Sequence, residues 1–480
     1  MRIKVFLVVP LFCVCIHLHA QPDSFNAFRS QVRQGYGEFR KSVLDSYADY
    51  LAKVWKEYEV FRGMKRDDTP KPAEAPDTKT IPSGTPKETK PTVPPVKEKP
   101  RKEPVAPVPP PVQPSVPEIS NNTVVDFYGI SVKVPQLHTV DIDAMTSNEV
   151  SKAWSEYSLN GTKKIANSFV EKAGAMRLND WFTYELVREC VNKQCETSNV
   201  ESRALLQFFL LANMGFDVRL AKTEVEPALL IAIDEQLYNR PYLTIGDKRY
   251  YIYSADSSGQ VSGKNMYTCE LPDDAYSGRQ LNMLITGSIY IGNRNKHNHT
   301  LSWNGMEVTA DIDEGMIEMV RHYPQMDIPR YADSELDAGV RQNILNQLKP
   351  HISGMTKKAA ANKLLHFLQF AFDYATDDDQ HGYEKPYFIE ENFYYPKNDC
   401  EDRAIFYAFL IRNLLGLDVH LVHFPGHECT AVCFGTENVI GSGYRYEGKT
   451  YIICDPTYIG ANIGQCMPQY EDVEPKVELW

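Results

Sequence analysis

The chain has 480 residues, 43% of them hydrophobic, and carries 51 basic against 63 acidic side chains. An acidic chain without a basic stripe is a poor candidate for a nucleic-acid-binding protein, so we exclude that class. A chain of this length does not need its ten cysteines as a disulfide scaffold.

The first twenty residues have the pattern of a secretory signal peptide. Arg2 and Lys4 precede an apolar run over residues 5–16, and a polar stretch then leads to Ala20. The run is too short to span a bilayer. We therefore expect a signal peptide over 1–20, cleaved after Ala20, and an exported protein in the periplasm, at the cell surface or secreted. The mature chain has 49 basic and 63 acidic residues, a net charge of −14.

Residues 21–64 show an eleven-residue aromatic repeat, in which Phe25, Tyr36, Tyr47 and Tyr58 are one period apart. Eleven residues in three turns keep one stripe on one face, which predicts a long amphipathic helix, most regular over 25–61. The other faces mix acidic and basic residues. This favours self-association or partner docking over membrane contact, which stays the alternative.

A proline-rich segment follows over 65–121 and contains sixteen of the 31 prolines. Such a composition buries too little apolar surface to fold, so we predict a disordered, extended linker.

The folded body is expected to begin near Asn122 with a β-hairpin that turns at Tyr128 and Gly129. A similar hairpin pattern turns at Asn304 and Gly305. Each hairpin opens one unit, and the predicted units cover 122–297 and 298–480.

Each unit contains a copy of one block. NVESRALLQFFLLANMGFDV from Asn199 matches DCEDRAIFYAFLIRNLLGLDV from Asp399, with one residue inserted before the glycine of the second copy. Beyond the insertion, Val218 aligns with Val419, and DKRYYIYSAD aligns with GKTYIICDPT. The pattern predicts a duplicated domain.

The copies share their apolar framework and differ at three polar positions. Val200, Glu226 and Ser254 of the first copy are replaced by Cys400, His427 and Asp455 of the second. Because the framework persists without these residues, they are not needed for folding. A nucleophile, a base and an orienting carboxylate are thus expected in the second copy alone.

The local pattern places these residues where such chemistry needs them. Asp399 is a suitable N-cap, so Cys400 lies in the first turn of a helix, where backbone N–H groups are expected to lower the thiol pKa. His427 begins one strand and Asp455 ends another. Antiparallel pairing of the two strands would bring imidazole and carboxylate together.

The ordered motifs DCEDRA, PGHECTAV and YIICDPT, within residues 355–465, resemble the transglutaminase-like superfamily. The resemblance implies an α+β fold of two tandem transglutaminase-like, papain-like domains, the first of them degenerate. It also implies a Cys400–His427–Asp455 triad, no cofactor, and a peptide or protein amide substrate that is hydrolysed or transferred. A further oxyanion donor upstream of the cysteine is usual in the family, and Gln380 and Tyr387 are the candidates.

Three alternatives stay open. The two copies could form a non-catalytic binding or assembly scaffold. Asp377, Asp378 and Asp379 could bind calcium, although a solvated loop is the preferred interpretation. The third alternative is a zinc site, whose four residues would be Cys400, His427, Cys429 and Cys454.

Overall fold

The computed structural model describes residues 122–478, except 239, 257–260, 262–265, 269–277, 290–294 and 322, together with the backbone of Lys87 and Glu88. The predicted signal peptide and aromatic-repeat helix, and all of the predicted linker except residues 87 and 88, lie outside the described residues. None of the described helices is long and apolar enough to cross a membrane.

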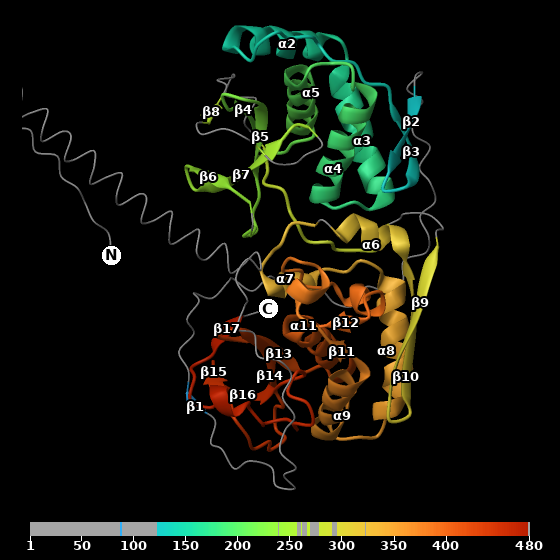
Figure 1. Cartoon of the computed structure of the whole chain (residues 1–480), viewed down its shortest axis with the longest axis vertical. Helices are drawn as coiled ribbons and strands as arrows, with labels where there is room; N and C mark the ends of the chain where they lie inside the picture. Colours follow the sequence, from blue (N-terminus) through green and yellow to red (C-terminus); the bar gives the residue numbers. More distant parts are fainter. Residues whose placement is uncertain are drawn as a thin grey trace, which may run out of the picture. The chain divides into compact units, whose positions relative to one another are not determined.

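The first half of the described body begins with a hairpin, continues through four helices and ends in an antiparallel sheet (Figure 1). Its elements are β2 (Asn122–Phe127), β3 (Ile130–Pro135), α2 (Ser147–Leu159), α3 (Thr162–Met176), α4 (Asp180–Gln194), α5 (Val200–Asn213), β4 (Val218–Lys222), β5 (Pro227–Ala232), β6 (Tyr242–Ile245), β7 (Lys248–Ser254) and β8 (Tyr267–Thr268).

The second half repeats this order of hairpin, helices and sheet. Its hairpin and helical region comprise β9 (Lys296–Trp303), β10 (Met306–Asp313), α6 (Glu314–Arg321), α7 (Ile328–Asp333), α8 (Ala338–Ile352), α9 (Lys357–Ala371), β11 (Asp373–Tyr374), α10 (Asp377–Gln380), η2 (Ile389–Phe393) and β12 (Lys397–Asn398). The remainder comprises α11 (Cys400–Leu410), η3 (Ile411–Leu415), β13 (Asp418–Phe424), β14 (His427–Cys433), β15 (Gly443–Tyr446), β16 (Lys449–Cys454), η4 (Pro468–Tyr470) and β17 (Lys476–Glu478). The fold is therefore of the mixed α+β class, as predicted.

The two main sheets have the same strand order. The first runs β6-β7-β5-β4-β8 and the second β15-β16-β14-β13-β17, with β1 (Lys87–Glu88) added beside β15. For β4–β5, β5–β7 and β6–β7 of the first sheet, adding 201 to both numbers of the pairs compared gives a pair in the second sheet, whereas β8 and β17 do not follow this shift. The pairs compared are Val218–Ile231 with Val419–Val432, Leu230–Ile252 with Ala431–Ile453, and Tyr242–Tyr251 with Gly443–Ile452.

Both predicted hairpins form, and they turn where the sequence indicated. Tyr128 and Gly129 have φ angles of 49° and 73°, and Asn304 and Gly305 have 46° and 77°. Positive φ at both central residues defines a type I′ turn, whose twist matches that of the flanking strands. The hairpin positions are therefore fixed by local turn chemistry.

The helices α5 and α11 each pack against the central strands of their own sheet. α5 is a regular helix, whereas α11 continues into the π-helical turn η3, which ends at Gly416 with a φ of 60°. A π turn accommodates one extra residue in a helix. The residue inserted before the glycine of the second copy is thus absorbed in η3.

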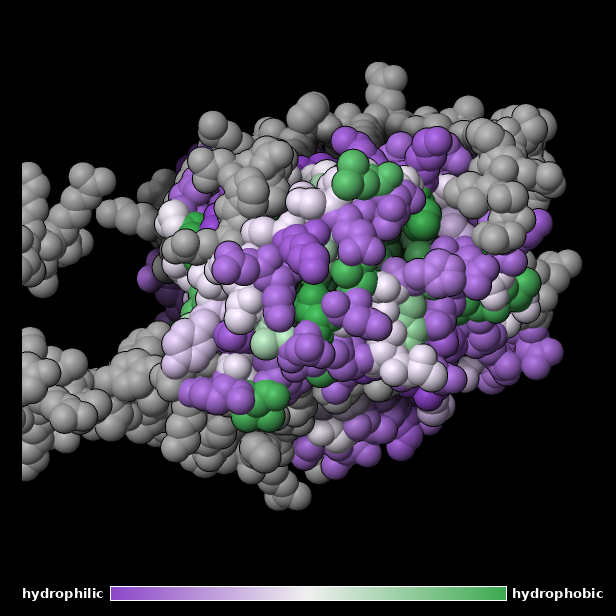
Figure 2. All heavy atoms as spheres, turned by 90° about the horizontal axis from the view of Figure 1, so that it is seen from above, coloured by the Kyte–Doolittle hydropathy of each residue, from purple (hydrophilic) through white to green (hydrophobic). Residues whose placement is uncertain are grey.

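One cluster of buried apolar side chains extends through both halves. Tyr323 is part of the connection, since its ring lies edge-on to Phe388 and tilted on Phe182, at centroid distances of 5.7 and 5.3 Å. Leu237 also forms a β-bridge with Met326. On the face drawn in Figure 2, hydrophobic side chains show only in small patches between hydrophilic ones. On this face, the apolar side chains therefore form no large continuous patch.

Candidate active site

His427 and Asp455 lie side by side in the second sheet. β14 begins at His427 and β16 ends just before Asp455, and the strands are antiparallel with Thr430 opposite Cys454. Nε2 of His427 is 2.8 Å from Oδ2 of Asp455, and each residue is 2% exposed. The juxtaposition expected from the strand pattern is therefore present, in a site from which water is largely excluded.

The Asp455 carboxylate is held in one orientation. Its Oδ1 accepts hydrogen bonds from the backbone N–H groups of Thr457 and Tyr458, at 2.9 and 3.2 Å. The side-chain amide of Gln369 donates to the backbone carbonyl of Asp455 at 3.0 Å. Because Oδ1 is occupied in this turn, Oδ2 is left for the imidazole.

Burial and the Asp455 carboxylate act in opposite directions on the pKa of His427. Burial lowers the pKa of His427, but the charge of Asp455 and the hydrogen bond to it outweigh burial, so the pKa is raised above its ordinary value. The ring of Tyr470 stacks on the imidazole with a centroid distance of 5.4 Å and an interplanar angle of 6°. Nδ1 of His427 has no hydrogen-bond partner among the described residues. It is therefore available to a reacting group.

Cys400 begins α11, which packs against β14. Its Sγ donates to Oε2 of Glu401 at 3.2 Å and is also hydrogen-bonded by the backbone N–H of Glu428, the residue after His427. The thiol thus lies beside the start of β14. In the described part of the chain, no hydrogen bond joins Sγ to the His427 ring.

The prediction that the pKa of the Cys400 thiol is lowered is wrong. Burial raises the pKa of Cys400 well above its ordinary range, and the carboxylates of Glu401 and Asp399 raise it further. The backbone N–H of Glu428 acts in the opposite direction and is outweighed. The first turn of α11 is crowded with acidic residues, so their charge opposes the favourable effect of the helix N-terminus.

Buried carboxylates gather on the side of Glu401. Oxygens of Asp377, Glu384 and Glu401 lie within 4.8 Å of one another, as do oxygens of Asp377, Asp399 and Asp402. These residues could hold a cation. The expectation of a solvated loop is wrong for Asp377, which is buried and whose pKa is raised well above its ordinary value by burial and nearby carboxylates.

The three acidic residues of the short helix α10 differ in exposure, since Asp377 is buried and the next two are exposed. Asp378 and Asp379 are exposed and do not belong to either carboxylate group. The predicted calcium set of three consecutive aspartates is therefore not the set that the structure brings together.

Gln380 and Tyr387, the proposed oxyanion donors, lie next to each other. Nε2 of Gln380 contacts the Tyr387 hydroxyl, and that hydroxyl is 2.6 Å from Nε2 of His381. Both side chains also reach the carbonyl of Lys397, three residues before the cysteine. In the described residues, neither is hydrogen-bonded to Cys400. Their donors are engaged with each other and with the backbone.

The predicted zinc set is only partly assembled. A ring nitrogen of His427, Sγ of Cys429 and a carboxylate oxygen of Asp455 lie within 4.8 Å of one another. Cys400 and Cys454 are outside this group. The described cysteines form no disulfide with one another.

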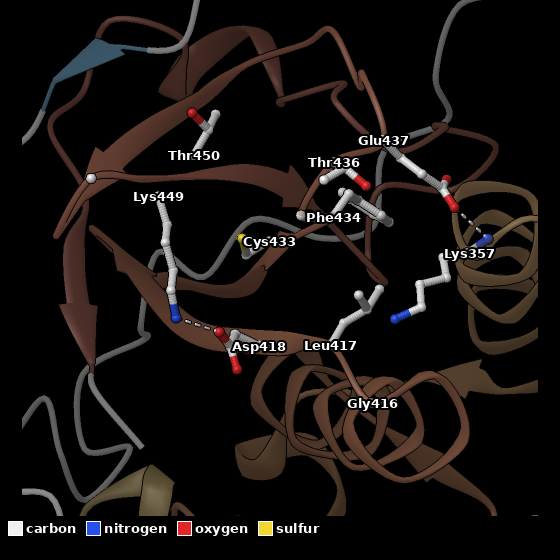
Figure 3. A pocket seen from close by; sticks show the side chains of 12 residues that line it. Lys357, Gly416, Leu417, Asp418, Cys433, Phe434, Thr436, Glu437, Lys449 and Thr450 are labelled. Carbon is white, nitrogen blue, oxygen red and sulfur yellow. Dashed lines mark hydrogen bonds and ion pairs between the residues drawn. The ribbon is translucent and has the colours of Figure 1, made fainter.

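An open cavity of about 720 Å³ lies elsewhere in the second half (Figure 3). It is lined by Asp418 at the start of β13, Cys433 at the end of β14, and Lys357 at the start of α9. His427 is at the opposite end of β14, about 20 Å away at 3.3 Å per residue. The cavity is therefore separate from the His427–Asp455 pair.

Several residues of the site were not predicted. Glu401 carried a signal, because DCED places three acids at the start of an otherwise apolar helix, where some must be buried. The sequence carries no signal for Tyr470 or Gln369, since both contact the site from distant positions in the chain.

No protein-family model, curated protein or solved structure matches the chain. The resemblance to the transglutaminase-like superfamily therefore rests on the motifs alone.

Proposed function

We propose that this protein is an exported cysteine-dependent enzyme that processes amides through a thioester on Cys400. The observation that carries the proposal is the buried His427–Asp455 hydrogen bond of 2.8 Å, with Nδ1 of the same ring unpartnered among the described residues. A buried imidazole oriented by a carboxylate, with its second nitrogen available, is the arrangement a general base needs.

In the proposed reaction, Sγ of Cys400 attacks the carbonyl carbon of an amide and its proton passes to Nδ1 of His427. The tetrahedral intermediate collapses as His427 returns the proton to the leaving amine, and the acyl group stays on sulfur as a thioester. Water or a second amine then attacks the thioester while His427 accepts its proton, and the thiol is released. Asp455 orients the ring and stabilises the imidazolium form.

The resting thiol is neutral in this mechanism, since its pKa is raised and it is bound to Glu401. It must turn from Glu401 toward Nδ1 before attack, so proton transfer accompanies the reaction instead of preceding it. The backbone N–H of Cys400, at the start of α11, is a suitable oxyanion donor.

We also propose that the two halves are a duplicated transglutaminase-like domain whose first copy has lost the triad. The support is the shared strand order and the constant shift of 201 residues between paired strands. The first copy then buttresses the second through the common core.

A second candidate function is a non-catalytic binding or assembly scaffold. The observation that favours it is the Cys400 thiol itself, which is hydrogen-bonded to Glu401 and not to His427. In this case the His427–Asp455 pair would serve only to join β14 to the turn after β16.

An acyl-trapping experiment separates the two functions. The mature chain is incubated with a peptide library, with and without hydroxylamine, and products are identified by mass spectrometry. An acyl-enzyme gives cleaved or deamidated peptides in water and hydroxamates with hydroxylamine. Both product classes are expected to vanish in Cys400→Ala and His427→Ala. If the wild-type chain forms neither product above the level of these variants, the scaffold is the better description.

A further inference from the structure

We propose that His427, Cys429 and Asp455 form a zinc-binding site, and that zinc bound there withdraws the imidazole and carboxylate from acyl transfer. The inhibitory part rests on the proposed function. The binding part stands on the geometry of the three residues alone.

The three donor atoms already lie close together. A ring nitrogen of His427, Sγ of Cys429 and an oxygen of Asp455 are all within 4.8 Å of one another. A zinc ion binds such donors at about 2.0–2.3 Å, which holds them roughly 3–4 Å apart. Small side-chain movements are therefore enough to close the site.

The strand geometry explains why the donors converge. His427 and Cys429 are two residues apart on β14, so their side chains point to the same face of the sheet. Thr430 pairs with Cys454, which places the next residues, Cys429 and Asp455, opposite each other. Two donors from one strand and one from its neighbour thus meet on a single face.

The donor types favour zinc over the common hard cations. Thiolate and imidazole ligands suit zinc, whereas magnesium and calcium prefer oxygen ligands alone. The carboxylate group around Asp377 is the oxygen-only type and lies on the Glu401 side of Cys400. The two clusters therefore differ in the class of metal that they would select.

Charge balance also supports binding in this buried place. Zinc carries two positive charges, and a Cys429 thiolate and an Asp455 carboxylate carry one negative charge each, so the filled site with a neutral imidazole has no net charge. On binding, a zinc–sulfur bond forms and the thiol proton leaves to solvent.

Occupation of the site prevents the proposed chemistry. A zinc-bound His427 is fixed by the metal and has lost its hydrogen bond to Asp455, so it cannot act as the proton acceptor for Cys400. Three protein ligands leave one coordination position for water. Zinc would then act as a reversible inhibitor whose removal restores the hydrogen-bonded pair.

The first half provides an internal contrast. The positions that correspond to His427, Cys429 and Asp455 under the 201-residue shift are Glu226, Ala228 and Ser254. None of these offers an imidazole or a thiol. One zinc ion per chain is therefore expected at this type of site, in the second half.

The binding test uses the untagged mature chain in competition with a chromophoric zinc chelator at neutral pH. The test variant is Cys429→Ala, which installs the residue found at the equivalent position of the first half. We expect its zinc affinity to fall at least about tenfold, the smallest effect typical even of losing an outer-shell partner. Cys433→Ala, on the same strand, and Cys400→Ala are expected to bind zinc like the wild type.

Cobalt(II) provides a second readout that is independent of activity. A thiolate-to-cobalt charge-transfer absorption is expected for the wild type and for Cys400→Ala, and its loss is expected for Cys429→Ala. Zinc binding that is undetectable, or that is unchanged in Cys429→Ala, overturns the site. If Cys400→Ala loses zinc binding while Cys429→Ala retains it, the sulfur ligand is a residue other than Cys429 and the proposed site is overturned as well.

The inhibitory part is tested on zinc-free and zinc-loaded protein in the hydroxylamine assay. Loss of products on zinc loading, and their recovery with a chelator, are expected. If the protein binds zinc but is inactive even when free of zinc, the proposed function is overturned and the zinc site is not. Full activity of zinc-loaded protein overturns the inhibition alone.

Discussion

Glu226 and Ser254 form a hydrogen bond of 2.8 Å in the first half, at the positions that His427 and Asp455 occupy in the second. A carboxylate and a hydroxyl thus replace an imidazole and a carboxylate without loss of the contact between the two strands. At this position the second half has an imidazole, the side chain that most often exchanges a proton near neutral pH, and the first half has none.

The Asp455→Asn variant is expected to lower the pKa of His427, because the carboxylate charge that offsets burial is removed. The folded-state pKa of His427 is raised, so the stabilisation from its charged form is complete below the unfolded value of about 6.5 and is lost as pH rises through the folded value. The free energy of unfolding of the wild type should therefore exceed that of Asp455→Asn by about 1–3 kcal/mol at mildly acidic pH. The difference should be smaller at alkaline pH.

Two measurements check this prediction. Histidine NMR titration gives the pKa of His427 in both proteins, and urea unfolding gives the stability gap at each pH. A gap that widens with rising pH would contradict the sign of the coupling.

The Glu401→Gln variant is expected to make Cys400 more reactive. Burial is the largest cause of its raised pKa, and the Glu401 carboxylate is the next, so removing that charge lowers the pKa and increases the thiolate fraction. Iodoacetamide labelling read by peptide mass spectrometry should be faster than in the wild type at every pH below the wild-type pKa. Glu201→Gln, at the aligned position of the first half, is the matched control and should leave the rate unchanged. Slower labelling in Glu401→Gln would contradict the effect assigned to the Glu401 carboxylate, because its charge and the hydrogen bond that it accepts both raise the thiol pKa.

Arg403→Met should destabilise the protein by about 3 kcal/mol, the upper range for lost hydrogen bonds to a charged group. Arg403 is 1% exposed and donates to Asn398 Oδ1 at 2.9 Å and to the Phe372 carbonyl at 3.1 Å. Both acceptors lose this donor in the variant. Arg203→Met changes the aligned residue, which is half-buried and donates to the Ser198 carbonyl. The free energy of unfolding, measured in urea, should fall clearly less in Arg203→Met than in Arg403→Met. Equal losses in the two variants would contradict the view that the deeper burial of Arg403 makes its hydrogen bonds more important.

Deletion of Leu415 is expected to preserve the fold. The π turn η3 contains the extra residue, and α5 in the first half reaches its glycine without it. The deletion should convert the turn to regular helix. Deleting Ala204 from the regular helix α5, which has no π turn, instead rotates the buried residues that follow in the helix by about 100° and should disrupt folding. Circular dichroism and thermal melts distinguish the two, and equal loss of structure in both would disprove the role assigned to η3.

Local signals made much of the fold predictable. The turn pairs at Tyr128 and Asn304, and the strands that carry His427 and end before Asp455, follow from turn chemistry and apolar periodicity. Helix α9 starts at Lys357, because Thr356 provides the cap, and it ends at Ala371. Neither the packing of the halves nor η2 could be foreseen, since both depend on contacts between distant segments.

The site was predictable in its geometry and not in its electrostatics. Strand order alone was enough to place His427 beside Asp455. The thiol pKa depends on burial and on which nearby acids point toward it, and sequence spacing gives neither. Glu401 is 5% exposed and accepts the thiol hydrogen bond, an orientation that its place beside Cys400 in the sequence does not determine.

The apolar core that runs through both halves constrains how this chain can change over time. Side chains such as Tyr323 pack against residues of both halves at once. A shorter chain that kept only the second half would therefore expose apolar surface to water and would be less stable. The apolar positions of the first half are therefore constrained by the packing of the second half as well as by their own fold.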